Sequence, residues 1–212
     1  MWHELADPSQ LHQLNRLARE RNWGLALLLA GWLHLLAFGL CYYLTVARGY
    51  HGAAGYLAVW VGELCGVALI FRLCGGPRPA EAPPPLARFV VRVWVAYFVL
   101  AFNLGTMNTL RGHHLFELFP AMASLASFAF LVMSFAVSRR FFWAVPVLFA
   151  AGLFMAAFLL HAYLIFGLAW WLVLNGVGLG LLARGRRREV ETLHSGRSAR
   201  RSPAMCGDPP VG

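Results

Sequence analysis

The chain alternates between long apolar segments and short polar links. The apolar segments span residues 23–47, 52–71, 89–110, 115–138, 141–160 and 162–183. An α-helix rises about 1.5 Å per residue, so about 20 apolar residues cross the hydrocarbon core of a bilayer, which is about 30 Å thick. All six segments reach that length. The pattern therefore predicts an all-α polytopic membrane protein, folded as a bundle of six transmembrane helices.

Polar residues dominate the two ends of the chain. In residues 1–22, Asp7 and Pro8 form a helix-start signal. Leu11, Leu14 and Leu17 then recur at helical spacing among polar residues, which is typical of an amphipathic helix lying in the membrane interface. A helix that docks a cytoplasmic protein partner is the alternative. Residues 184–212 are rich in Arg, Pro and Gly, and we expect an arginine collar against anionic lipid followed by disorder.

Positive charge sorts to one side of the predicted bundle. The chain has eighteen arginines and no lysine. Sixteen of them lie in the two tails, around the link between the second and third segments, or in the link between the fourth and fifth, against only Arg48 and Arg111 on the opposite side. The positive-inside rule then predicts cytoplasmic N- and C-termini. A nucleic-acid-binding protein would not distribute its charge by alternate links, so we exclude that class.

Composition agrees with residence in a membrane. Hydrophobic residues make up 59% of the chain and charged residues 13%, whereas soluble domains carry about 25% charged residues. Replacement of all lysine by arginine, with abundant Ala and Gly, fits a GC-rich bacterial genome. We therefore predict a multi-pass protein of the bacterial inner (plasma) membrane, with residues 23–183 as its transmembrane domain.

Few polar groups fall inside the predicted spans. His34 and Glu63 each lie roughly 15–16 Å, at 1.5 Å per residue, from the end of their segment that adjoins the link between the two segments. Consecutive helices joined by a short link are usually neighbours, so the two side chains could meet as a pair. An intramembrane polar belt would add three residues of the third and fourth segments: Asn103, Ser124 and Ser127.

The belt has two interpretations. Hydrogen bonds between helices would fix the packing, at about 0.6–2 kcal/mol each. Alternatively, histidine and carboxylate side chains inside a membrane form proton or solute paths in transporters.

Histidines also gather at the predicted outer face. They are His51, His113, His114 and His161, and they are accompanied by Glu117, four residues after His113. Zinc and other transition metals accept imidazole and carboxylate ligands of this kind. A metal site at the outer face is thus a second hypothesis, with His113, His161, Glu117 and His51 as ligands. His114 points about 100° from His113 on a helix, which argues against both being ligands.

Three further residue types bear on helix geometry and chemistry. Pro120 and Pro146 predict either late helix starts or kinks. Gly176 and Gly180 have the spacing that allows close helix packing, which we expect within the bundle rather than at a dimer face. The four cysteines are too dispersed for a disulfide framework.

Three functions remain open from the sequence. The first is a small transport or permeation component, or the membrane subunit of a complex, that uses the intramembrane belt. The second is a metal-binding enzyme or redox protein of the outer face. The third is a membrane scaffold that docks a cytoplasmic partner.

Overall fold

The computed structural model describes residues 8–50, 53–75 and 84–201. Their α-helices are α1 (Pro8–Glu20), α2 (Trp23–Val46), α3 (Ala53–Cys74), α4 (Pro85–Leu110), α5 (Phe119–Ala136), α6 (Ala144–Ala157) and α7 (Ala162–Arg201). Short 3-10 helices, η1 (Leu115–Leu118), η2 (Arg139–Trp143) and η3 (Leu159–His161), precede α5, α6 and α7. Six helical segments in the described part of the chain are long and apolar enough to cross a membrane. The predicted all-α fold and its six spans are confirmed, and the chain is a polytopic membrane protein.

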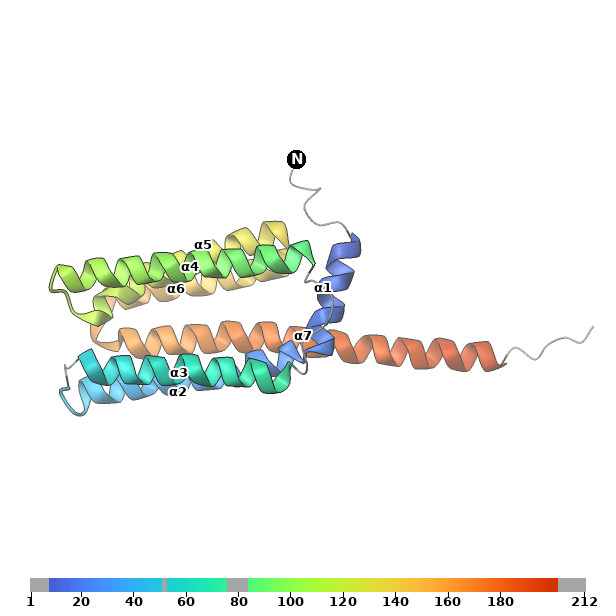
Figure 1. The fold of residues 1–212 in the computed structure, drawn as a ribbon, viewed down its shortest axis with the longest axis horizontal. Helices are drawn as coiled ribbons and strands as arrows, with labels where there is room; N and C mark the ends of the chain where they lie inside the picture. The colour runs from blue at the N-terminus through green and yellow to red at the C-terminus, as the bar shows by residue number, and fades with distance from the viewer. Residues whose placement is uncertain (1–7, 51–52, 76–83, 202–212) are drawn as a thin grey trace, which may run out of the picture.

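The six spans form two groups of three (Figure 1). One group consists of α2, α3 and α7, and the other of α4, α5 and α6. Contacts of α6 and α5 with α7 join the groups, while α3 packs mainly on α2. The central core is largely aromatic, with Phe38, Phe119, Tyr163 and Phe166 all buried. Because α3 touches the bundle on one side only, most of its surface faces outward.

The amphipathic helix α1 lies across one end of the bundle (Figure 1). Leu11 and Leu14 pack on a cluster of buried residues from α4 and α5, which includes Leu86 and Met133. Asn22, with a φ of 44°, makes the corner between α1 and α2. Asn tolerates this left-handed conformation better than most residues, because its short side chain can hydrogen-bond locally. The helix predicted from the leucine spacing is present, and its apolar side is packed on the bundle.

Prolines set the starts of two helices. Pro120 lies in the first turn of α5 and Pro146 in the first turn of α6. Proline is tolerated in a first turn because its missing N–H would have no intrahelical partner there. Of the two alternatives predicted, the structure has the late helix start rather than the kink. A short 3-10 helix forms immediately before each of these α-helices.

The last helix continues beyond the apolar segment. Disorder is predicted after the arginine collar, but α7 extends to Arg201 (Figure 1). Arg is common in this stretch and is a good helix former, so the helix can propagate into the polar segment. The predicted disorder of the remaining residues, 202–212, lies outside the described part of the chain.

Glycine packing in α7 differs from the prediction. A Cβ on Gly176 would lie 2.5 Å from the Trp143 ring, so this glycine is closely packed within the bundle. Gly180 has no atom within 4 Å of the same position, so the prediction fails there. Gly178 makes the backbone approach instead, against Gly24 of α2. Successive helical residues are about 100° apart, so Gly178 lies roughly opposite Gly176 and reaches a different neighbour.

Candidate functional site

An ionisable pair joins α2 and α3 near the middle of both helices. His34 Nδ1 donates a hydrogen bond to Glu63 Oε1. The two side chains retain 16% and 11% of their accessible surface, so both are largely removed from their surroundings. The sequence places these residues at one depth, and the structure brings them into contact. A paired histidine and carboxylate can exchange a proton between them, which no other described pair inside the spans can do.

Aromatic rings surround the His34 imidazole. Its ring centroid lies 4.4 Å from that of Phe38, 6.0 Å from Phe166 and 5.9 Å from Trp170. Its second nitrogen, Nε2, is buried and has no hydrogen-bond partner among the described residues. A neutral imidazole that donates from one nitrogen presents a lone pair on the other. His34 therefore has one nitrogen fixed by Glu63 and one left to accept a proton.

The other three residues of the predicted belt lie apart from this pair. Asn103 is exposed on the surface of α4. The Ser124 hydroxyl donates to Pro120 O, in its own helix, at 3.0 Å. Ser127 is buried and donates to Val145 O of α6 at 3.3 Å. The sequence fixes the depth of a residue but not the side of the bundle it faces, so equal depth does not make one network.

A hydroxyl network that was not predicted from the sequence lies further along α2 and α3, toward Tyr50. Thr45 Oγ1 lies 2.8 Å from Tyr56 Oη, and both residues are buried. Thr45 Oγ1 also lies 2.8 Å from Cys41 O, and Tyr56 Oη lies 2.6 Å from Tyr50 O. Spacing in the sequence carries the signal: Tyr56 precedes Glu63 by seven residues, which returns it to the same helix face.

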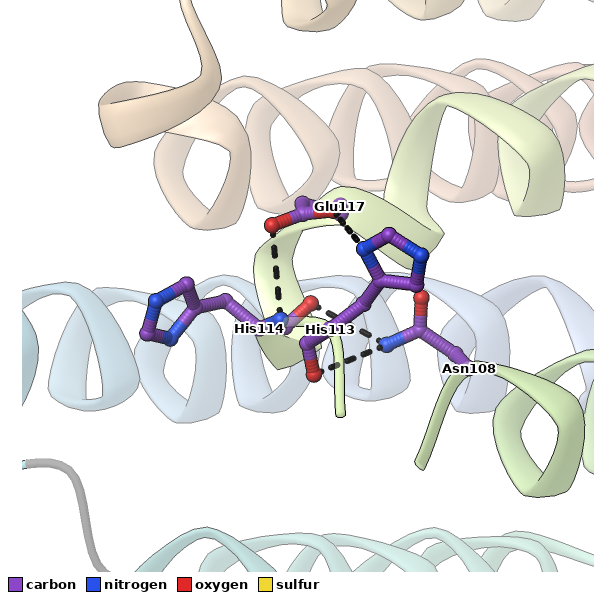
Figure 2. A network of polar contacts seen from close by, with 4 residues as sticks. All are labelled: Asn108, His113, His114 and Glu117. Carbon is purple, nitrogen blue, oxygen red and sulfur yellow. Dashed lines mark hydrogen bonds and ion pairs between the residues drawn. The ribbon is translucent and has the colours of Figure 1, made fainter. Parts of the chain in front are cut away.

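Two of the histidines that the sequence predicts at the outer face, His113 and His114, take part in a turn (Figure 2). His113 Nδ1 lies 2.8 Å from Glu117 Oε2. Glu117 Oε1 also accepts the His114 N–H at 3.4 Å, as in a helix N-terminal capping box. Asn108 Nδ2 donates to the carbonyl oxygens of His113, at 3.4 Å, and His114, at 3.1 Å. These bonds hold the chain as it turns from α4 into η1.

Those predicted metal ligands that lie in the described part of the chain do not converge at one point. No group of three or more His, Cys, Asp or Glu side chains in the described ranges could hold a metal ion. His113 and Glu117 meet, but His161 lies beside Tyr42, at a ring-centroid distance of 5.8 Å. His114 instead stacks on Phe116, at 5.1 Å. His51 lies outside the described residues. Helix ends that share one face of the membrane need not bring their side chains to one point.

The pair of His34 and Glu63, together with the hydroxyl network, is thus the candidate functional site of the described bundle. Comparison of the chain with family models, with curated proteins and with solved structures finds no match.

Proposed function

We propose that this protein is a small transport component that conducts protons through the membrane, with the His34–Glu63 pair as its proton-binding site. The observation that carries the proposal is the direct contact of these two ionisable side chains at the centre of two spanning helices. Ionisable residues inside a membrane are costly, and transporters use them as proton relays. That the chain is a polytopic membrane protein rests on its six long apolar helices and does not depend on this proposal.

The chemistry of the pair supports a proton carrier. Histidine is the side chain whose charge most readily changes near neutral pH. Glu63 stabilises the protonated imidazole, and the unpartnered Nε2 is the atom through which a proton can enter or leave. Packing alone would be served equally well by a neutral pair, which would avoid the desolvation cost of a carboxylate.

We also propose a bacterial plasma membrane, with both termini in the cytoplasm and anionic lipid against the arginine-rich end. Arg16, Arg19 and Arg21 lie at the end of the bundle covered by α1. Arg72, Arg88, Arg139 and Arg140 occupy helix ends on that side, and Arg92 lies one turn further into α4. Arg48 and Arg111 lie at the opposite ends of their helices. The positive-inside rule supports this orientation.

The proposal is tested by proton flux into lipid vesicles. Purified protein is reconstituted with a trapped pH-sensitive dye, and a potassium gradient with valinomycin imposes a membrane potential. We expect wild-type vesicles to acidify faster than protein-free vesicles, and Glu63→Gln to abolish the difference. Gln preserves the size and one acceptor oxygen of Glu63 but cannot ionise. Glu117→Gln is the matched control, because it removes a carboxylate from the turn at the end of the bundle and should leave flux unchanged.

Two outcomes would contradict the proposal. One is wild-type flux no greater than that of protein-free vesicles. The other is equal flux in wild type and Glu63→Gln, which would assign the pair to packing.

A further inference from the structure

Polar side chains line the seam between α2 and α3 from the pair toward Tyr50. From the pair toward the α2–α3 link, α2 presents Cys41 and Thr45, while α3 presents Trp60 and Tyr56. In the other direction the seam is apolar where Leu33 packs on Gly66, since a Cβ on Gly66 would lie 2.6 Å from Leu33 Cδ2. Among the described residues, the buried polar groups of the α2–α3 seam beside the pair therefore lie on the side that leads to Tyr50, whereas Asn175 of α7 lies against Gly31 on the other side.

The hydroxyl network has two equivalent arrangements of its protons. Thr45 and Tyr56 supply two hydroxyl protons, but the network contains three oxygen–oxygen contacts. In one arrangement Thr45 donates to Tyr56, which donates to Tyr50 O. In the other, Tyr56 donates to Thr45, which donates to Cys41 O. The two arrangements point in opposite directions, so the passage of one proton converts the first into the second.

The interval between the pair and the hydroxyls contains polar side chains. Glu63 and Tyr56 are seven residues apart on α3, roughly 10 Å at 1.5 Å per residue, and His34 and Thr45 are eleven residues apart on α2, roughly 16 Å. The buried Cys41 thiol lies in this interval, close enough to Glu63 for the two groups to interact electrostatically. Trp60 Nε1 is also buried, and its side chain interacts with the Cys41 thiol. Water bound to these groups would complete the connection, because the groups supply the polar partners that a buried water needs.

We propose that the α2–α3 seam is the path by which protons pass between the His34–Glu63 pair and the end of the bundle at Tyr50. This path rests on the proposed function. Water accepts the proton from the pair and passes it to Thr45 Oγ1. Thr45 gives its own proton to Tyr56 Oη, and Tyr56 releases its proton to water beside Tyr50. One proton enters and one leaves, and rotation of both hydroxyls restores the starting arrangement. Tyr163 of α7 stacks on Tyr56 at 5.6 Å and holds its ring in place.

The test removes each hydroxyl separately in the vesicle assay. Thr45→Val and Tyr56→Phe keep the side-chain shape and lose the hydroxyl. We expect each to slow flux by about tenfold, less than the roughly hundredfold or more that a positioned proton-transfer group contributes, because water partly replaces it. Thr45→Ser retains a hydroxyl and should restore most of the flux. Tyr97→Phe is the matched control, since it removes a buried tyrosine hydroxyl on α4, away from the seam.

The outcomes separate the path from the function. Wild-type flux in both Thr45→Val and Tyr56→Phe, with flux abolished in Glu63→Gln, overturns the path and leaves the proton-binding pair in place. Equal loss in Tyr97→Phe and Tyr56→Phe also overturns the path, because any buried hydroxyl would then have the same effect. Absence of flux in the wild type overturns both proposals. Thr45→Val decides the question if Tyr56→Phe does not fold.

Discussion

Gly24 of α2 and Gly178 of α7 pack backbone against backbone. A Cβ added to Gly24 would lie 2.9 Å from the Gly178 carbonyl oxygen, and a Cβ added to Gly178 would lie 2.7 Å from the Gly24 carbonyl oxygen. Further along the same pair of helices, Gly31 faces Asn175 and Gly167 faces Phe38. Small residues therefore alternate between the two helices and let α2 and α7 approach along most of their length.

A methyl group at Gly178 should destabilise the protein. Because its nearest neighbour is a backbone oxygen, the helices must separate, and overpacking of this kind costs about 1–3 kcal/mol. We expect Gly178→Ala to lower the thermal unfolding temperature in detergent. Gly180→Ala is the control, because nothing lies within 4 Å of its added methyl group. Equal unfolding temperatures for the two variants would show that the close approach does not contribute to stability.

Much of the fold follows from the length of apolar segments, whereas the pairing of helices does not. Each span needs about 20 apolar residues, so the six helices are visible in the sequence. The contact of α2 with α7, the first span with the last, depends on which faces carry small residues. Gly176, Gly178 and Gly180 all occur within one turn and a half, and only the structure shows that Gly178 faces α2.

The candidate site could also be predicted only in part. His34 and Glu63 could be paired from the sequence because a short link joins their helices. Asn103 could not be excluded from the belt, because its exposure depends on the rotation of α4. The histidines predicted for the outer face belong to different links, with His113 and His114 after α4 and His161 in η3, and Glu117 is engaged by the turn after α4.

The His34–Glu63 contact predicts coupled effects on stability. Removal of one partner leaves the other buried without compensation, at a cost of about 3 kcal/mol or more, whereas removal of both avoids that cost. Unfolding in detergent should therefore be measured for His34→Ala, Glu63→Gln and the double variant. We expect the double variant to be more stable than the sum of the single effects predicts, with a coupling energy of about 0.5–3 kcal/mol. Strict additivity would indicate that the side chains do not interact.

The two serines of α5 should differ in their contribution to packing. Ser127 is buried and bonds across to α6, while Ser124 is exposed and bonds to its own helix. Ser127→Ala removes an interhelical hydrogen bond, worth about 0.6–2 kcal/mol, and leaves Val145 O without that donor. We expect Ser124→Ala to change the unfolding temperature less. A larger decrease in the unfolding temperature for Ser124→Ala would contradict a stabilising role for the interhelical hydrogen bond of Ser127.

The charge asymmetry predicts the orientation of the bundle. With sixteen of eighteen arginines on one side, we expect α1 to face the cytoplasm and the turn at His113 to face outward. Single-cysteine variants report this directly, after replacement of Cys41, Cys65, Cys74 and Cys206. Gln13 in α1 and His113 are both exposed, so cysteine at either position can react. A membrane-impermeant maleimide added to intact cells should label His113→Cys, and it should label Gln13→Cys only after the membrane is opened. The reverse pattern would invert the orientation, and with it the direction in which the α2–α3 seam opens.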